Sequence, residues 1–370
     1  MRAVVWEGPG VPMHVEEVPD PRPGPGEVLV RIAATGVCHT DLHVMKGEVA
    51  FPGPGVLGHE ISGHVEALGE GVDGFAVGNR VVGAFIMPCG ECSQCQDGRD
   101  DMCETFFAEN RLRGNLFDGT SRLTRQDGSR LSMYSMAGLA DLAVVPASAL
   151  TPLPEELPLE ESAVLGCAAF TAYGAIARAQ HDIRGRAVAV VAVGGVGSAI
   201  VQLARHLGAS PVIAIDVDDD KLAVVRELGA DVVVNSRTTD AREAVLEATG
   251  GAGAELVLEV LGRPETVELG FSLLREGGQL VVVGIAAGAA TAAIPITPMV
   301  RRGMTITGSF GARTRRDLPE VVRLAAEGAF DVRRTVTRRF SLEKAPEAYD
   351  LLDAGRIQGR AIVVMEPSST

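Results

Sequence analysis

The chain has 370 residues, of which 46% are hydrophobic and 22% charged, and its formal net charge is −14. This length exceeds that of one ordinary hydrophobic core and predicts two domains. The negative charge disfavours nucleic acid as a partner, because phosphates would be repelled.

The sequence was searched for an export signal and for membrane-spanning stretches. The N-terminal residues contain no apolar signal-peptide core, so we expect a cytoplasmic protein. Residues 187–204 and 281–300 carry no charged residue, and the second stretch reaches the length of a spanning helix. It contains Pro295, Pro298 and many small residues. Buried parallel strands also give uncharged runs, so we expect no membrane association.

Two kinds of hydrophobic pattern divide the chain. Residues 1–163 contain short β-rich runs between turns (1–6, 26–37, 63–69 and 79–86) and predict a β-rich domain. Residues 164–306 alternate strand-like and helix-like runs, which predicts βαβ units around a parallel sheet. One expected helical run in this alternation is FSLLREGG, residues 271–278. Residues 307–370 hold two helical runs and a last strand, and we expect them to return to the first domain.

Four of the six cysteines form one tight cluster, C-x2-C-x2-C-x7-C. A disulfide framework is disfavoured in a long chain without an export signal. Four thiolates at this spacing can surround one tetrahedral Zn(II), with no position left for substrate. We therefore predict a structural zinc site, with an iron–sulfur cluster as the alternative. The predicted ligands are Cys89, Cys92, Cys95 and Cys103.

A glycine fingerprint marks a dinucleotide site between a strand-like and a helix-like run. The segment Gly194–Gly195–Val196–Gly197 lies there, although Ala192 stands where the first glycine of G-x-G-x-x-G is expected. The helix N-terminus would offer N–H groups to a pyrophosphate. Asp216, at the end of the next strand, would accept hydrogen bonds from the ribose diol and repel a 2′-phosphate, which favours NAD over NADP. Lys221 is a further candidate beside the adenosine ribose.

The segment that begins at Gly58, G-H-E-x2-G-x5-G-x2-V, matches the signature of the zinc-containing alcohol dehydrogenases in the medium-chain dehydrogenase/reductase superfamily. The cysteine cluster, GVCHTD and GCAAFTAYGA resemble further segments of that family, over essentially the whole chain. The resemblance implies an α/β fold: a GroES-like β-rich catalytic domain (1–163 with 307–370, its structural-zinc lobe at 89–103) and a Rossmann cofactor domain (164–306). It also implies a homodimer or homotetramer acting on a small-molecule alcohol or aldehyde.

The same resemblance implies a catalytic Zn(II) held by Cys38, His59 and Cys167, so that the chain would bind two zinc ions and NAD. Three protein ligands leave a position for substrate. Asp41 resembles the carboxylate that orients the ligand histidine, and Glu60 the acid beside the metal. Thr40 and His43 occupy the positions of the family's proton relay, which passes through the nicotinamide ribose.

The remaining site positions follow from the same resemblance. His39 and Arg360 resemble residues that contact the pyrophosphate, and Val283 and Ile285 would flank the nicotinamide. The predicted pocket wall is mostly apolar and favours a hydrophobic or aromatic alcohol. Besides Thr40, it comprises Val49, Phe85, Met102, Met133 and Tyr134.

Three other functions stay open at this point. The segment NLFDGTSRL resembles formaldehyde dehydrogenases that act on thiol adducts, although Phe107 lies near where their glutathione-dependent type carries an anion-binding arginine. A non-catalytic regulatory zinc protein would hold one zinc ion, and a quinone reductase of the same fold would hold none.

Overall fold

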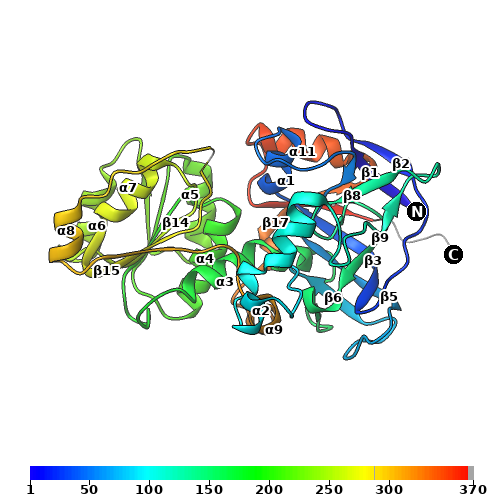
Figure 1. Ribbon diagram of the computed structural model, residues 1–370. Coiled ribbons are helices and arrows are strands. Elements are labelled where there is room, and N and C mark those ends of the chain that lie inside the picture. The colour runs from blue at the N-terminus through cyan, green and yellow to red at the C-terminus, as the bar shows by residue number, and fades with distance from the viewer. Residues whose placement is uncertain (287, 366–370) are drawn as a thin grey trace. The chain divides into compact units, whose positions relative to one another are not determined.

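The structure is a computed structural model that describes residues 1–286 and 288–365 (Figure 1). It divides into two compact units, of which unit 1 comprises Met1–Phe170 with Arg313–Thr370, and unit 2 comprises Thr171–Ala312. These boundaries fall a few residues after those expected from the sequence. Residues 366–370 of the expected return segment lie outside the described residues.

Unit 2 is built on a six-stranded parallel sheet. Its strands are β11 (Val188–Val191), β12 (Val212–Asp216), β13 (Val232–Asn235), β14 (Ala254–Glu259), β15 (Leu274–Val282) and β16 (Thr305–Gly308). Their spatial order is β13-β12-β11-β14-β15-β16, which is the doubly wound order of dinucleotide-binding sheets. The strands β11, β12 and β14 are buried along their whole length, as strands covered on both faces are.

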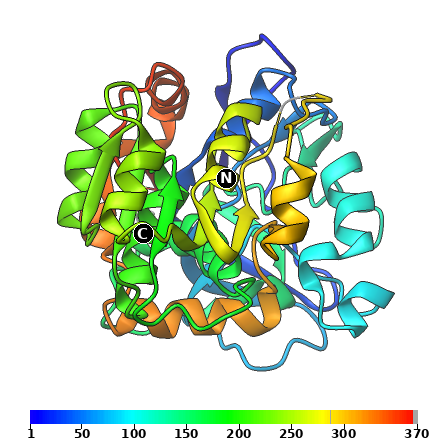
Figure 2. The ribbon, with the colours of Figure 1, turned by 90° about the vertical axis from the view of Figure 1, so that its left-hand side faces the viewer.

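The helices between these strands follow the alternation expected from the sequence, and Figure 2 shows them against the strands of unit 2 in green to orange. They are α4 (Gly195–His206), α5 (Asp219–Glu227), α6 (Ala241–Ala248), α7 (Pro264–Ser272) and α8 (Ile296–Arg301). Asp218 and Asp240 cap α5 and α6 by accepting hydrogen bonds from backbone N–H groups of the first turn.

One sequence expectation in unit 2 is wrong. The run 271–278 is not a helix: α7 ends at Ser272, and β15 already begins at Leu274. Pro264 starts the helix earlier in the chain, because its fixed φ suits the first helical position. The alternation of helices and strands was therefore predicted, but the boundary between α7 and β15 was not.

The turn between β11 and α4 explains both the glycine and the alanine of the fingerprint. A Cβ on Gly197 would lie 2.1 Å from the carbonyl oxygen of Ala192, so only glycine lets helix and turn approach this closely. Ala192 itself has φ +72°, in the left-handed region that disfavours side chains. The departure from the usual glycine thus leaves the turn's conformation in place and strains one residue.

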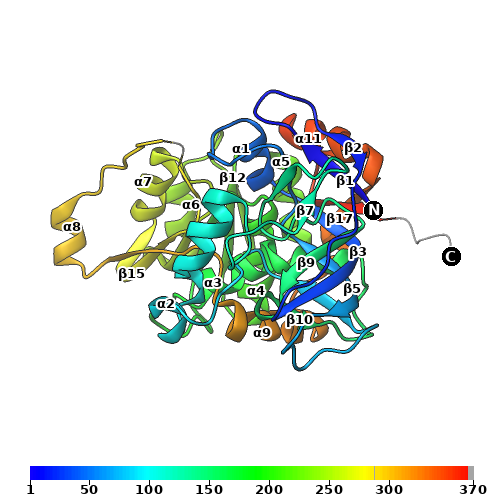
Figure 3. The same cartoon turned by 45° about the vertical axis from the view of Figure 1, so that its right-hand side comes forward.

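Unit 1 centres on the long strand β3 (Glu27–Val37), which pairs with three neighbours. They are β5 (Ile61–Leu68), β9 (Leu142–Pro146) and β18 (Arg360–Val364), and Figures 1 and 3 show β3, β5 and β9 side by side. The same sheet continues to β6 (Arg80–Gly83), β10 (Leu150–Pro152) and β17 (Val336–Ser341). C-terminal residues thereby complete the sheet begun at the N-terminus.

A second sheet and short helices complete unit 1. The sheet contains β1 (Arg2–Trp6), β2 (His14–Glu17), β4 (Gly55–Val56), β7 (Leu123–Thr124) and β8 (Arg130–Met133). The α-helices are α1 (His39–Met45), α2 (Ser93–Gln96), α9 (Thr314–Ala326), α10 (Val332–Thr335) and α11 (Ala345–Asp353), while α3 (Ala168–Ile176) starts in unit 1 and ends in unit 2. Short 3-10 helices cover Asp100–Met102, Ala147–Ala149, Glu161–Gly166 and Leu342–Lys344, and a π-helix covers Phe106–Arg111.

The two uncharged stretches of the sequence are not spanning helices. Residues 187–204 form β11 and most of α4, and residues 281–300 include the end of β15 and most of α8. Within the described part of the chain, no helix has the length and apolar character needed to cross a bilayer.

The strain at Ala192 predicts a stabilising substitution. Ala192→Gly should raise the free energy of unfolding by about 1 kcal/mol, because a left-handed alanine costs about 1–2 kcal/mol and glycine removes that cost while gaining some unfolded-state entropy. The matched control is Ala199→Gly inside α4, which should lower stability by about 1 kcal/mol. Denaturant unfolding measures both, and equal signs for the two variants would contradict the assignment.

Candidate active site

Three segments far apart in the chain bring metal-binding side chains together in unit 1. Cys38 follows β3 and caps α1, His59 lies between β4 and β5, and Cys167 lies between the 3-10 helix Glu161–Gly166 and α3. Their ligand atoms and one oxygen of Glu60 all lie within 4.8 Å of one another, and all four residues are buried. The structure therefore gathers the three predicted catalytic ligands.

The donor set fits a zinc ion. His59 Nδ1 lies 3.0 Å from Asp41 Oδ1, so that nitrogen carries the proton and donates to the carboxylate. With its proton on Nδ1, the imidazole would offer the lone pair of Nε2 to a metal ion. His59 Nε2 is buried without a hydrogen-bond partner among the described residues, and Glu60 Oε1 lies 3.8 Å from it. Two thiolates and one imidazole are the protein ligands of one known type of catalytic zinc site, in which water or substrate takes the fourth position.

Charges around this set favour a cation. Burial opposes a charged imidazole at His59, yet the carboxylate of Asp41 and the thiolate of Cys38 raise its pKa to about 10. A hydrogen bond from Cys167 lowers the pKa of Cys38 and raises that of Cys167, so the two thiols share a proton. A divalent cation bound by these three residues would displace their protons, because metal ligands bind in their deprotonated forms.

Glu60 and Arg360 form a buried ion pair beside the donor set, with Arg360 Nη2 donating to Glu60 Oε1. Burial raises the pKa of Glu60 to about 7, although the guanidinium of Arg360 acts in the opposite direction by stabilising the carboxylate. A Cβ on Gly36 would lie 2.0 Å from Glu60 Oε2, so glycine in β3 makes room for this carboxylate. Arg360 is 6% exposed and engaged by Glu60, and its role toward a cofactor stays a prediction.

The relay candidates lie on α1. Thr40 Oγ1 lies 3.6 Å from Cys38 Sγ, at the edge of the donor set. His43 is exposed, and its Nδ1 hydrogen-bonds the carboxylate of Glu48. His39, the first residue of α1, is also exposed. Their spacing places a hydroxyl beside the metal ligands and an imidazole at the surface of unit 1.

Two of the predicted pocket residues lie against the ring of His59. The His59 ring makes edge contacts with Phe85 and Tyr134, at centroid distances of 6.0 and 6.2 Å. Met133 is buried next to Tyr134 in sequence. Val49 and Met102 are 40% and 54% exposed, and their place in the pocket wall stays a prediction.

Arg111, which ends the π-helix Phe106–Arg111, was not selected from the sequence. Its guanidinium carbon lies 4.2 Å from the centroid of the Tyr134 ring. Its Nη1 and the Tyr134 hydroxyl are both buried without a hydrogen-bond partner in the described chain. The guanidinium thus lies against the predicted pocket wall. It is recognised only from its stacking contact with Tyr134, which sequence spacing does not reveal.

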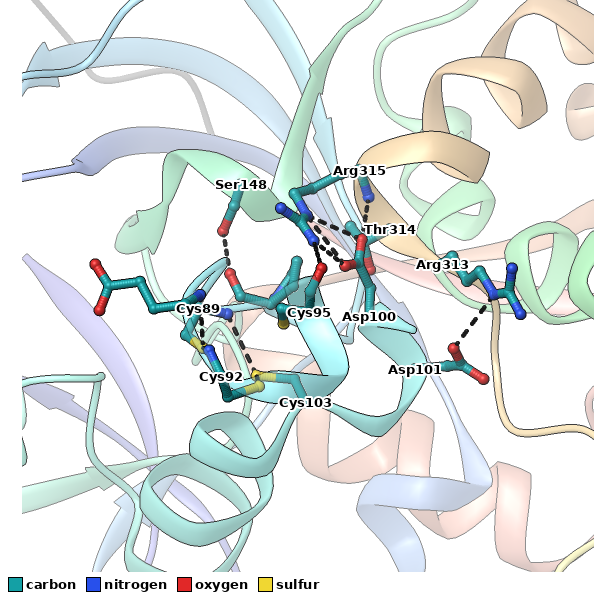
Figure 4. Close-up of polar contacts among 12 residues, drawn as sticks. Cys89, Cys92, Cys95, Asp100, Asp101, Cys103, Ser148, Arg313, Thr314 and Arg315 are labelled. Carbon is teal, nitrogen blue, oxygen red and sulfur yellow. Dashed lines mark hydrogen bonds and ion pairs between the residues drawn. The ribbon is translucent and has the colours of Figure 1, made fainter. Parts of the chain in front are cut away.

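The four-cysteine cluster has the geometry of a metal site (Figure 4). The Sγ atoms of the four residues lie within 4.8 Å of one another, and those of Cys92 and Cys103 lie 3.9 Å apart. Tetrahedral Zn(II) with Zn–S bonds of about 2.3 Å separates its sulfurs by about 3.8 Å. Burial raises the pKa of Cys103 to about 11 and that of Cys95 further. At Cys92, burial is outweighed by hydrogen bonds from the backbone N–H groups of Cys95 and Glu104, which lower its pKa to about 6. A bound cation is therefore needed to hold all four sulfurs as thiolates.

Arg315, in helix α9, hydrogen-bonds residues of this lobe, a contact that was not predicted from the sequence (Figure 4). Its Nη2 donates to Asp100 Oδ1 and to the carbonyl oxygen of Cys95, each at 2.6 Å. Its backbone N–H also donates to Asp100 Oδ2 at 2.9 Å. Since Asp100 is buried, loss of the guanidinium would leave a poorly paired carboxylate beside a cysteine ligand.

In unit 2, the candidate cofactor residues surround the N-terminus of α4. Gly194 is exposed and precedes the first turn, where Gly195, Val196 and Gly197 follow. Asp216 Oδ2 accepts from the Val193 N–H at 2.8 Å, and its Oδ1 accepts from the Val217 N–H at 2.7 Å. The acid thus joins the end of β12 to the glycine turn.

The other cofactor candidates are less constrained. Lys221 lies in the first turn of α5, where its N–H binds the capping carboxylate of Asp218. Val283 follows β15, and its N–H donates to the Glu259 carbonyl oxygen. Ile285 is 71% exposed.

Comparisons with known proteins agree with this architecture. Residues 24–155 match the alcohol dehydrogenase GroES-like domain, and residues 195–327 match the zinc-binding dehydrogenase family. An alcohol dehydrogenase of Geobacillus stearothermophilus is 34% identical over 369 residues, which cover 99% of this chain and 100% of that protein.

Solved structures give the same result. A zinc-binding-domain alcohol dehydrogenase protein of Burkholderia ambifaria has a TM-score of 0.93 and 33% identity, over 99% of both chains. A benzyl alcohol dehydrogenase of Acinetobacter calcoaceticus has a TM-score of 0.91 and 30% identity, also over 99% of both chains. The expected GroES-like and Rossmann folds are confirmed, and the chain belongs to the zinc-containing alcohol dehydrogenase family of the medium-chain dehydrogenase/reductase superfamily.

Proposed function

We propose that the chain oxidises a hydrophobic or aromatic alcohol to its aldehyde or ketone with NAD, using a zinc ion held by Cys38, His59 and Cys167. The observation that carries the proposal is the buried donor set, in which His59 Nε2 has no hydrogen-bond partner within the described part of the chain. When bound, zinc supplies Lewis acidity that favours loss of the alcohol proton, and NAD accepts the hydride. A second zinc ion would occupy the four-cysteine cluster.

The chain's own groups account for the movement of the proton. We assign to Thr40, whose hydroxyl oxygen lies 3.6 Å from Cys38 Sγ, the role of accepting the alcohol proton while its own proton passes toward His43. His43 is exposed and hydrogen-bonded to Glu48, so it can take up a proton and release it to solvent. Burial of the ligands and of Glu60 keeps water away from this side of the donor set.

The proposed preference for NAD rests on Asp216. Its carboxylate is 8% exposed at the end of β12, next to the glycine turn, and it is held there by backbone N–H groups. A carboxylate in that place accepts hydrogen bonds from a ribose diol and repels a 2′-phosphate.

The proposed substrate class rests on the rings around His59. Phe85 and Tyr134 contact that ring at their edges, and Phe51 contacts Tyr134 at 4.9 Å between centroids. Such a wall suits an apolar or aromatic body. The similarity to a benzyl alcohol dehydrogenase supports the same class.

Arg111 favours one second candidate, oxidation of the adduct of formaldehyde with an anionic thiol. Its guanidinium lies against Tyr134 with no ionic partner in the described chain, and a substrate carboxylate would supply one. Formaldehyde supplied together with an acidic thiol tests this candidate, which predicts faster NAD reduction than any simple alcohol gives.

The principal test follows NAD reduction with alcohols from ethanol to benzyl alcohol, with and without a chelator. We expect chelator-sensitive reduction that is faster for the larger alcohols, and much slower reduction of NADP. No reduction with any alcohol or thiol adduct, by protein that holds both zinc ions, would refute the proposed enzyme and favour a regulatory protein.

Removal of one ligand of the proposed catalytic zinc ion should cost the chain that ion and leave the zinc ion of the four-cysteine cluster in place. We expect His59→Ala to hold one zinc ion per chain instead of two and to lose roughly 10³-fold or more in kcat/KM, since the Lewis acidity contributes several kcal/mol. His64→Ala, on β5, is the matched control and should retain both. Atomic absorption and steady-state kinetics measure the two effects, and an active His59→Ala protein would contradict the assignment.

Loss of the charge at Asp216 should relax the choice of cofactor. In Asp216→Asn, we expect the ratio of kcat/KM for NAD to that for NADP to fall by about tenfold or more, because a charged hydrogen bond contributes about 1.5–3 kcal/mol. The ratio cancels any general damage to the turn. A ratio equal to that of the unmodified protein would show that this carboxylate does not select the cofactor.

Arg315 should retain zinc in the four-cysteine lobe. Arg315→Met should release one zinc ion to a chelator about tenfold faster and lower the melting temperature, because the buried Asp100 carboxylate loses its main cation. The adjacent Arg316→Met is the control, since Arg316 pairs with Asp317 instead. Equal release rates for the two variants would refute this role.

A further inference from the structure

Asp41 has a second side-chain hydrogen-bond partner besides the metal-ligand candidate His59. Its Oδ1 accepts from His59 Nδ1 at 3.0 Å and from the Gly58 N–H at 3.2 Å. Its Oδ2 accepts from the Tyr349 hydroxyl at 2.9 Å. Tyr349, Asp41 and His59 are all 0% exposed, so the three side chains form one buried chain of hydrogen bonds.

Tyr349 comes from a distant part of the sequence. It lies on α11, in the C-terminal segment of unit 1, whereas Asp41 lies on α1. The two helices lie side by side in Figures 1 and 3, and residues of each contact the other. The hydroxyl is thus delivered to Asp41 by helix packing and not by local sequence.

The hydroxyl settles the orientation of the carboxylate. Both donors on Oδ1 come from the segment Gly58–His59, and they leave Oδ2 to be satisfied from elsewhere. A buried carboxylate oxygen without a donor would favour rotation of the group or entry of water. With Tyr349 on Oδ2, the plane of the carboxylate is fixed, and Oδ1 stays directed at His59 Nδ1.

We propose that Tyr349 is a positioning residue for the metal-binding His59, acting through Asp41. The hydroxyl fixes the carboxylate, the carboxylate fixes the proton on Nδ1 and the plane of the ring, and Nε2 is thereby aimed at the donor set of Cys38 and Cys167. This inference rests on the proposed function, because it assigns Tyr349 a role toward the zinc ion that these residues would hold. Partners of this kind change metal affinity by about 10- to 100-fold when they are removed.

The test compares Tyr349→Phe with the unmodified enzyme. We expect zinc to leave the Cys38–His59–Cys167 site about tenfold faster into a metallochromic chelator, and the visible bands of the cobalt(II)-substituted enzyme to shift. We also expect kcat to fall with little change in KM for the alcohol, because Tyr349 contacts Asp41 and not the predicted pocket residues. Thr314→Val is the matched control, since it removes a buried hydroxyl that donates to the Ile86 carbonyl oxygen.

A double-mutant cycle tests whether Tyr349 acts through Asp41. Asp41→Ala alone should release zinc faster still, and adding Tyr349→Phe to it should change nothing further. An unchanged release rate and cobalt spectrum in Tyr349→Phe, or additive effects with Asp41→Ala, would overturn the inference. The folded fraction of each variant is checked by its unfolding transition, and Tyr349→Met gives a second removal of the hydroxyl.

The same measurements separate failure of the inference from failure of the proposed function. If His59→Ala keeps the zinc content of the unmodified protein, the proposed metal site is wrong and the inference falls with it. If His59→Ala loses one zinc ion while Tyr349→Phe releases it at the normal rate, only the inference is refuted.

Discussion

Unit 1 buries two thiols, an imidazole, two carboxylates and a guanidinium in one region, and most of its local architecture can be understood from that concentration of charge. Isolated buried charges are costly, so each group needs a partner. Glu60 is paired with Arg360, and Asp41 accepts hydrogen bonds on both oxygens. The remaining donors, His59 Nε2 and the two thiols, are the groups that a zinc ion would satisfy.

This requirement extends to the strands and helices that carry the groups. Glycine at position 36 of β3 makes space for Glu60, and β18 brings Arg360 to the same place. Cys38, which directly precedes α1, and Thr40 and Asp41 in its first turn lie within four positions of the chain. The C-terminal segment is therefore part of the site, because it provides both Arg360 and Tyr349.

Features encoded by local spacing were predictable from the sequence. The four cysteines lie within one short loop region, so their clustering follows from chain connectivity. The βαβ alternation likewise predicted the parallel sheet, although the end of α7 and the start of β15 were misplaced. The resemblance to known dehydrogenases singled out Cys38, His59 and Cys167, whose separation in the chain gives no geometric signal of its own.

Contacts between distant segments could not be predicted in the same way. Arg315 with Asp100, Tyr349 with Asp41 and Arg111 over Tyr134 each join segments that have no common periodicity or motif. Ala192 shows a related limit: the motif asks for glycine, whereas the structure needs only the left-handed conformation, which alanine adopts with strain. A motif thus specifies a backbone shape, and a residue that departs from it need not abolish that shape.

We propose that the chain holds two zinc ions in chemically different sites. The most direct measurement is a crystallographic anomalous difference map of the protein recorded at the zinc absorption edge. We expect two peaks per chain, one among the sulfurs of the four-cysteine lobe and one among Cys38, His59 and Cys167 with a coordination position open to a small molecule. A map without a peak beside His59, from protein that carries zinc in the lobe, would contradict the proposal.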